Sequence, residues 1–329
     1  MLPVKLAGLG YYLPERRVTN AELEATLGIP PGWIARLTGA QERRYVGSET
    51  SAGMGAAAGQ RALTQAGIDV ADVDLIIGAS TAPQQAIPCT AVFVQRELGA
   101  PEGQSACFDV NATCQSFLFG LHTAAHLVAA GAYRTALVYS SEITSRSLNP
   151  QERESAVLFG DAAAAAVVTA SAPGEASAIW HAQFATHHSG AELSQLRGGG
   201  TLHHPNDPTT LPVMNVFEMR GPTLFKQGIR LAEPFLDRFF ATLGWDRQTV
   251  DAVVPHQASG PAIAMFVHRF GFHHDQLVIN FPTRGNCIAA SLPLALAEAV
   301  ESGRIRRGDR VVLAGSGAGL TLGALALTF

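Results

Sequence analysis

Residues 74–81 read DLIIGAST and residues 251–259 read DAVVPHQAS, and the chain continues in a similar way after each stretch. The first is followed by FVQRELG at Phe93 and the second by FVHRFG at Phe266. Further on, AAGAYRTALVYSSE in the first half corresponds to VESGRIRRGDRVVLAGSG in the second. Because self-similarity of this kind marks a repeated structural unit, the sequence predicts a duplication.

The duplication also aligns two polar residues. When Gly131 and Gly303, each of which ends a helical stretch, are superposed, Cys114 and Asn286 fall at equivalent places. Both are expected just ahead of a helix and after a strand. We therefore predict two halves, residues 1–172 and residues 173–329, with no disordered linker between them.

Short apolar runs alternate with stretches of helical periodicity along the whole chain. The runs that read as buried strands are Val73 to Ala79, Ala136 to Ser140, Ala162 to Thr169, Val250 to Val254, Leu277 to Asn280 and Arg310 to Ala314. The stretches with helical spacing are Gly55 to Ala66, Ala91 to Leu98, Phe117 to Ala130, Pro222 to Leu243, Ile263 to Phe270 and Leu292 to Ser302. Strands and helices in alternation predict an α/β layered fold.

The composition argues against several classes of protein. With a formal net charge of -4, the chain lacks the basic character that a general nucleic-acid binder needs. Its longest apolar run, residues 162–172, is well short of the roughly 20 residues of a membrane-spanning helix. The N-terminal residues do not have the pattern of a signal peptide, so we expect a cytoplasmic protein.

Cys114 is the cysteine of most chemical interest. The four cysteines, Cys89, Cys107, Cys114 and Cys287, have no CxxC spacing, which disfavours a disulfide framework and a zinc site. At the start of a helix, unpaired N–H groups and the helix dipole would lower the pKa of the Cys114 thiol. A cysteine among small apolar residues is more often inert core filling, so Cys114 alone does not establish a nucleophile.

Several longer segments provide more specific evidence. They read DVNATCQSFLFGL around Cys114, LFGDAAAAAVV from Leu158, VPHQAS from Val254, RGNCIAASLPLAL from Arg284 and GSGAGLTLGALAL from Gly315. In order and spacing they resemble the ketoacyl-acyl-carrier-protein synthase III family. The resemblance extends from GLGYYLPERRVTN near the start, through GWIARLTGAQERR, to the C-terminus. A single PHQ or GDAA would be weak evidence, but the agreement of independent motifs is specific.

The resemblance implies a five-layered thiolase fold (αβαβα) of two similar α/β halves, assembled as a homodimer. Cys114 matches the nucleophile that accepts an acyl group from acyl-CoA, which splits the reaction into two steps. His256 matches the catalytic histidine and Asn286 the catalytic asparagine. Their N–H groups would stabilise the negative charge that develops when a malonyl-thioester loses CO2. No metal or organic cofactor is implied.

The resemblance also implies supporting residues. The backbone N–H groups of Cys114 and Ala318 would form a second oxyanion hole, the latter within a glycine-rich turn. Trp33 and Arg153 match positions that hold the adenine end of CoA, by stacking and by charge. Ile87 matches the wall of the acyl pocket, where a branched aliphatic side chain would suit a longer or branched starter.

The sequence departs from the family pattern around the expected entrance channel. Ser259 and Pro222 stand where asparagine is common, and Pro261 stands where arginine is common. Losing an arginine at the mouth would weaken docking of an acidic acyl carrier protein. The acceptor, malonyl-ACP or malonyl-CoA, and the pathway, fatty-acid or polyketide and other secondary metabolism, therefore stay open.

Three functional hypotheses follow. The first is decarboxylative condensation to a β-ketoacyl product, which the complete set of Cys114, His256 and Asn286 favours. The second is an acyltransferase or non-decarboxylating condensing enzyme of secondary metabolism that uses the same acyl-Cys114 intermediate. The third is a catalytically silent partner of an active homologue, which an intact Cys114 and His256 argue against.

Other polar residues are interpreted conservatively. His122 and His126 have the i, i+4 spacing of a metal site, but no third ligand accompanies them, so we expect plain helix-face residues. The segment 187–211 contains three consecutive glycines and HHPNDPTT. We expect it to form a surface excursion that borders the active-site entrance.

Overall fold

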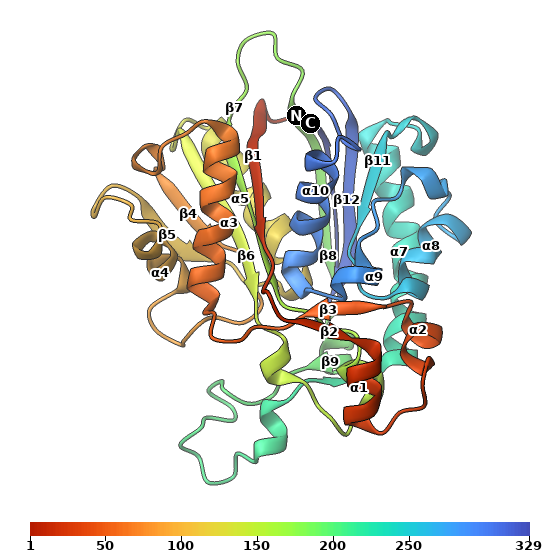
Figure 1. Ribbon diagram of the computed structural model, residues 1–329. Coiled ribbons are helices and arrows are strands. Elements are labelled where there is room, and N and C mark those ends of the chain that lie inside the picture. Colours follow the sequence, from red (N-terminus) through yellow and green to blue (C-terminus); the bar gives the residue numbers. More distant parts are fainter.

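Two mixed β-sheets form the framework of the molecule in the computed structural model, which describes residues 1–329 (Figure 1). In spatial order, the first sheet contains β1 (Val4–Tyr12), β7 (Ala162–Ala170), β6 (Thr135–Glu142), β4 (Leu75–Gly78) and β5 (Ala106–Asp109). The second contains β8 (Ala178–Thr186), β13 (Thr321–Thr328), β12 (Arg310–Gly317) and β11 (Ala252–Pro255). Each sheet is therefore built from one half of the chain.

The two sheets repeat the same topology. In the first, β1 and β7 pair antiparallel, β7 and β6 pair antiparallel, and β6 and β4 pair parallel. The second sheet has the corresponding pairs in the same order: β8 and β13 antiparallel, β13 and β12 antiparallel, and β12 and β11 parallel. The duplication predicted from the sequence is thus present in the strand order.

Helices form three layers around the two sheets. α5 (Ser116–Ala129) and α10 (Ser291–Glu301) share one apolar core with the inner faces of both sheets. α3 (Ser51–Ala66) and α4 (Thr90–Glu97) cover the outer face of the first sheet. α7 (Gly221–Leu243) and α8 (Gly260–His268) cover the outer face of the second (Figure 1). The layer order αβαβα confirms the predicted fold class.

Shorter elements complete the chain. Two small antiparallel ribbons pair β2 (Arg17–Thr19) with β3 (Glu42–Arg44) and β9 (Ser194–Gln195) with β10 (Glu218–Met219). The remaining helices are α1 (Asn20–Leu27), α2 (Trp33–Thr38), α6 (Arg153–Ala156) and α9 (Phe281–Arg284). No helix is both long enough and apolar enough to cross a membrane.

Local signals explain where the long helices begin and end. Thr50 caps α3 by accepting a hydrogen bond from the Gly53 N–H, and Gly67 ends the helix in the left-handed conformation. α7 begins with Gly221 and Pro222 and ends at Gly244, again left-handed. These residues fix the ends of the two outer helices, of which α7 borders the site.

The structure corrects two of the sequence-based expectations for single elements. Residues 277–280 do not form a strand, because only Leu277 pairs, through a single bridge to Val253. Cys114 does not open the long helix itself. It lies in a 3₁₀ turn, Thr113–Gln115, and α5 begins one residue later, at Ser116.

The predicted equivalence of Cys114 and Asn286 is also wrong, by three residues. The side chains of Asn111 and Asn286 each accept from the N–H two residues later, at Thr113 and Ile288, and these two residues share a positive φ of 51° and 47°. Asn111 is thus the counterpart of Asn286, and Ala289 that of Cys114. The predicted alignment of the two halves was displaced because α10 has 11 residues and α5 has 14. Superposing the C-terminal ends of the two helices therefore moves their N-terminal ends out of alignment.

Candidate active site

Cys114, His256 and Asn286 line one cavity of about 590 Å³ at the carboxyl ends of strands from both sheets. His256 follows β11 and Cys114 precedes α5, whereas Asn286 lies between α9 and α10. The three residues come from distant parts of the sequence, and the duplicated fold brings them together. Most of the cavity wall is apolar.

The turn that carries Cys114 is held by a second glycine-rich turn. The hydroxyl of Thr113 donates to the carbonyl oxygen of Ala318 at 3.1 Å. A methyl group at Gly317 would lie 2.8 Å from that hydroxyl oxygen and 3.2 Å from the Cys114 nitrogen. Glycine is therefore required at position 317 because the two backbones approach so closely.

The backbone N–H groups of Ala318 and Cys114 act on the Cys114 sulfur and lower the pKa of the thiol. Burial, together with the nearby carboxyl of Glu142, has the larger effect and raises that pKa to about 12. The expectation of a lowered pKa is therefore wrong for the free protein. Although Cys114 lies deep in the molecule, it keeps some accessibility because the cavity reaches it.

His256 is buried and uncharged at neutral pH. Its exposed fraction is 5%, and burial lowers the pKa of the imidazole to about 4. Nδ1 has no hydrogen-bond partner, so no acceptor in the protein stabilises a charged ring. A neutral ring carries one N–H that it can donate into the cavity.

Gln257 fixes the backbone beside His256. Its amide nitrogen donates to the carbonyl oxygens of Pro255 and Val278, and its amide oxygen accepts from the N–H groups of Asn280 and Phe281. These bonds tie the histidine segment to the chain that leads to Asn286. The glutamine of the HQAS motif is therefore a structural clamp.

Asn286 is fixed by its backbone and by its side chain. Its N–H donates to Leu158 and its carbonyl oxygen accepts from Gly160, which joins it to the LFGD segment. Its side-chain oxygen accepts from the Ile288 N–H at 2.9 Å, so the amide nitrogen is the part left to donate. This orientation suits a donor to a developing oxyanion.

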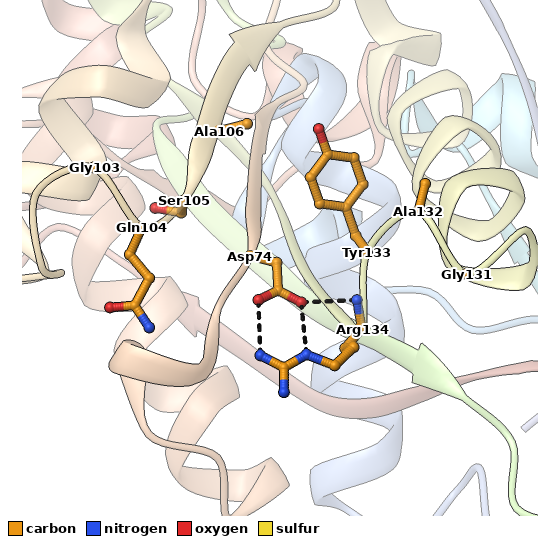
Figure 2. A pocket seen from close by; sticks show the side chains of 9 residues that line it. All are labelled: Asp74, Gly103, Gln104, Ser105, Ala106, Gly131, Ala132, Tyr133 and Arg134. Atoms are coloured by element: carbon orange, nitrogen blue, oxygen red, sulfur yellow. Dashed lines mark hydrogen bonds and ion pairs between the residues drawn. The ribbon is translucent and has the colours of Figure 1, made fainter.

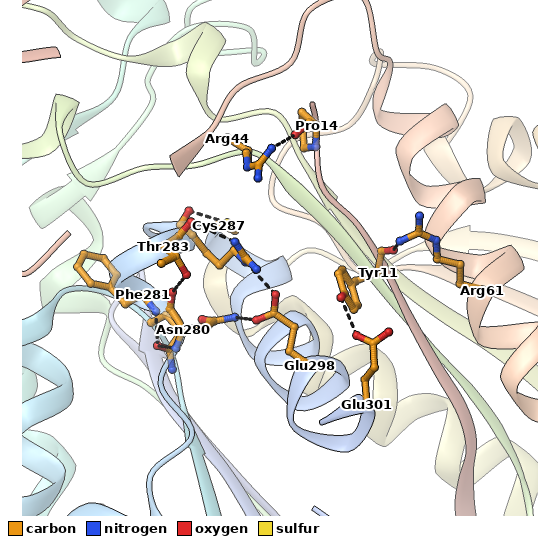
Figure 3. A network of polar contacts seen from close by, with 12 residues as sticks. Tyr11, Pro14, Arg44, Arg61, Asn280, Phe281, Thr283, Cys287, Glu298 and Glu301 are labelled. Carbon is orange, nitrogen blue, oxygen red and sulfur yellow. Dashed lines mark hydrogen bonds and ion pairs between the residues drawn. The ribbon is translucent and has the colours of Figure 1, made fainter. Parts of the chain in front are cut away.

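A polar network supports the segment before Asn286 (Figure 3). Glu298 on α10 accepts from the Arg284 guanidinium and from the Asn280 amide, each at 2.8 Å. Glu301, one turn further, accepts from the hydroxyl of Tyr11 on β1 at 2.7 Å. Through α10 the network joins the asparagine segment to the first sheet.

Glu142 is a cavity residue that the sequence analysis missed. It ends β6, is 1% exposed, and accepts from the Thr81 N–H at 2.6 Å. Burial raises the pKa of its carboxyl to about 8, although N–H groups of Thr81, Ala82 and Ala289 partly oppose that rise. A glutamate at the carboxyl end of a buried strand was the available signal, because sites in α/β folds gather there.

The predicted CoA and acyl-pocket residues lie outside the cavity wall. Trp33 begins α2 and Arg153 begins α6, and other residues of these helices, Leu37 and Glu154, line the cavity. Ile87 does not shape this chain's cavity, since its segment crosses the surface between β4 and α4 and its exposed fraction is 83%.

The predicted entrance residues do line the cavity. Pro222 comes from α7, and Ser259 and Pro261 come from the start of α8. As expected, the 187–211 segment borders the same cavity, through Ser194 to Leu196. Leu196 and Phe225, which also line it, are among the exposed large apolar side chains of the surface.

Two other features carry no catalytic groups. Figure 2 shows a hollow beside Asp74 and Arg134, which pair with each other at 3.2 Å and hold the start of β6 next to β4. His122 and His126 lie with their Nε2 atoms 3.0 Å apart on α5, and no cluster of three metal-ligating side chains is present. We assign no site to either feature.

Comparison with known families gives a consistent result. Residues 108–187 match the family model for 3-oxoacyl-[acyl-carrier-protein (ACP)] synthase III, and residues 240–329 match the model for its C-terminal part. The β-ketoacyl-[acyl-carrier-protein] synthase III of Symbiobacterium thermophilum is 38% identical over 99% of this chain and 98% of its own length. Synthase III 3 of Streptomyces coelicolor is 39% identical over 98% and 96%.

Solved structures agree with this likeness. The 3-oxoacyl-[acyl-carrier-protein] synthase III of Aquifex aeolicus superposes with a TM-score of 0.90 and 33% identity, over 99% of this chain and all of that one. A variant of OleA from Xanthomonas campestris gives a TM-score of 0.88 and 25% identity, over 100% of this chain and 98% of that one.

Proposed function

The chain belongs to the β-ketoacyl-[acyl-carrier-protein] synthase III family of condensing acyltransferases with the thiolase fold, and on that basis we propose residue roles for its reaction. Cys114 accepts an acyl group from acyl-CoA, and His256 and Asn286 assist condensation with a malonyl-thioester. The observation that supports this most is that all three line one largely apolar cavity.

In the first step the Cys114 sulfur attacks the carbonyl carbon of acyl-CoA. A new thioester forms on Cys114, the bond between the acyl group and the CoA sulfur breaks, and the thiol proton passes to the departing CoA sulfur. The backbone N–H groups of Ala318 and Cys114, which lower the pKa of the thiol, stabilise the tetrahedral oxyanion. Because burial raises the pKa of the free thiol, Cys114 is protonated at neutral pH in the resting protein.

In the second step a malonyl-thioester loses CO2 and negative charge develops on its thioester oxygen. His256 is neutral and Asn286 presents its amide nitrogen, so each donates a hydrogen bond to that oxygen and keeps its proton. The carbanion then attacks the acyl-Cys114 thioester and gives a β-ketoacyl product. The released Cys114 thiolate takes up a proton and restores the resting enzyme.

Binding and assembly belong to the same proposal. Trp33 and Arg153 hold the nucleotide end of CoA near the mouth, where their helices border the cavity. The protein works as a cytoplasmic homodimer, and the exposed Ile87 lies on a surface that a second copy can cover. Light scattering of the purified protein tests the dimer, and a monomer would contradict it.

Intact-protein mass spectrometry tests the first step. Wild type and Cys114→Ala are incubated with acyl-CoAs from acetyl to long-chain and with malonyl-CoA. We expect one acyl adduct on the wild type and none on Cys114→Ala, which has no sulfur to acylate. Failure of every donor to label the wild type would contradict the acyl-Cys114 intermediate.

Release of CO2 separates the two reaction types. With acyl-Cys114 formed, malonyl-CoA and malonyl-ACP are added in turn and CO2 is measured together with the β-ketoacyl product. We expect CO2 in equal amount to the product. Acyl transfer from Cys114 without CO2 would instead support the alternative, a non-decarboxylating acyltransferase that uses the same intermediate.

A further inference from the structure

The cavity does not end at the three catalytic residues. It continues between α7 and α8, where Ile229, Ala232 and Leu236 of α7 lie opposite Met265 and Phe266 of α8. We call this part the α7–α8 branch. From Phe225 at the mouth to Leu236, α7 rises by roughly 16 Å at about 1.5 Å per residue.

The inner end of the α7–α8 branch is apolar and closed to solvent. Leu236, Phe235, Phe266 and Phe270 line it and are all buried. The ionisable residues of the cavity wall are Cys114, Glu142, Glu154 and His256, and none of them comes from α7 or α8. The inner end therefore offers no partner for an amide or a carboxylate, and only hydrocarbon suits it.

One residue keeps the branch wide. Gly228 lies in the middle of α7 and lines the cavity, and a methyl group added there would meet no atom within 4 Å. Glycine weakens a helix interior, so an alanine or larger residue at this position would favour the helix but narrow the cavity. Ala232, one turn further, is also small and lines the same wall.

We propose that the α7–α8 branch holds the hydrocarbon tail of the acyl group on Cys114, so that this enzyme takes medium- to long-chain acyl-CoA donors. The inference rests on the proposed acylation of Cys114, since the branch opens from the same cavity. An acetyl or propionyl group would leave most of the branch empty. Each methylene buried there improves donor recognition about fourfold, which selects for chain length.

The test compares acylation rates across a series of saturated acyl-CoAs from two to sixteen carbons, at donor concentrations below saturation. Wild type should be acylated faster as the chain lengthens, until the branch is full. Gly228→Leu places a side chain in the branch and should lower the ratio of long-chain to short-chain rates at least tenfold. Ala232→Phe is a second filling variant with the same expected direction.

Arg230→Leu is the matched control. It adds the same side chain to α7 at an exposed position that does not line the cavity, and its chain-length profile should match the wild type. Thermal unfolding of each variant verifies that it is folded.

Any of four results would overturn the inference. An unchanged chain-length profile in both filling variants would show that the tail lies elsewhere. An equal fall in the acylation rate with every donor would show that the branch holds the part common to all CoA thioesters. Absence of any adduct on the wild type would overturn the proposed function as well, whereas acylation by short donors alone would overturn only the chain-length inference.

Discussion

Glu142 shares the active-site cavity with Cys114, and its charge acts on the sulfur. The buried carboxyl has a pKa raised to about 8, so it is largely protonated at neutral pH and ionises as the pH rises further. Once ionised, it raises the pKa of Cys114. No cation pairs with Glu142, so hydrogen bonds from nearby backbone N–H groups are the main interactions that stabilise its negative charge.

Replacing Glu142 with glutamine should therefore make Cys114 more reactive in alkali. The rate at which iodoacetamide alkylates Cys114 is measured from pH 7 to 10 by peptide mass spectrometry. In Glu142→Gln the rate should rise at lower pH than in wild type, because no negative charge opposes the thiolate. Glu142→Asp keeps the charge and serves as the control. Identical profiles for wild type and Glu142→Gln would contradict the coupling.

The same carboxyl predicts how stability depends on pH. Unfolded, it ionises near its ordinary pKa of 4.5, whereas folded it stays protonated until about pH 8. The stability that this carboxyl contributes is thus fully present below about pH 4.5 and is lost as the pH rises through 8. Over that range the free energy of unfolding falls by up to about 1.4 kcal/mol per pH unit. His256 changes stability only below its ordinary pKa of 6.5. The free energy of unfolding, measured with urea, should therefore fall less steeply between pH 6.5 and 8 in Glu142→Gln than in the wild type.

At the scale of elements, the sequence predicted the long helices, the strands β4, β6, β7 and β12 and the edge strand β11, but it missed the central strand β13 and three edge strands. β1 and β8 were not predicted, although both are nine-residue strands. β1 contains Gly8 and Gly10, which interrupt the apolar pattern because α3 packs against their Cα atoms. A local pattern cannot report such a close approach of two distant segments.

The candidate site was predicted unevenly for a related reason. The motifs around Cys114, His256 and Asn286 are local, and the structure brings all three residues to one cavity. Glu142 and Gly228 act through their surroundings, which are assembled from distant segments. The thiol pKa was misjudged because helix position is visible in a sequence, whereas the depth of burial is not.

The turn at the end of β12 gives a prediction at this scale. In Gly317→Ala the added methyl group would crowd the Thr113 hydroxyl and the Cys114 N–H, so the two turns must separate. We expect acylation of Cys114 to fall at least tenfold, because Ala318 would lose its position, and the protein to lose about 1–3 kcal/mol of stability. Gly200→Ala, where nothing lies within 4 Å, is the control. Normal acylation in Gly317→Ala would show that the turn adapts freely.

At the scale of the whole molecule, α10 connects the two halves. Its apolar residues pack in the core that the two sheets share, and its polar residues contact both the asparagine segment and β1. One central layer therefore supports chemistry contributed by both halves. Loss of the contacts between α10 and the asparagine segment should therefore disturb the step that depends on Asn286 more than the step that depends on Cys114.

Glu298→Ala tests this division between the two steps. The substitution leaves the part-buried Arg284 and Asn280 without their acceptor, which should cost about 1–3 kcal/mol in urea unfolding. Product formation from malonyl-thioester should fall severalfold, because the segment before Asn286 loses its anchor, while acylation of Cys114 stays near the wild-type rate. Glu301→Ala removes only the exposed bond to Tyr11 and should change both steps little. If Glu298→Ala slowed acylation and condensation equally, α10 would support the cavity as a single unit and the proposed division between the two steps would be wrong.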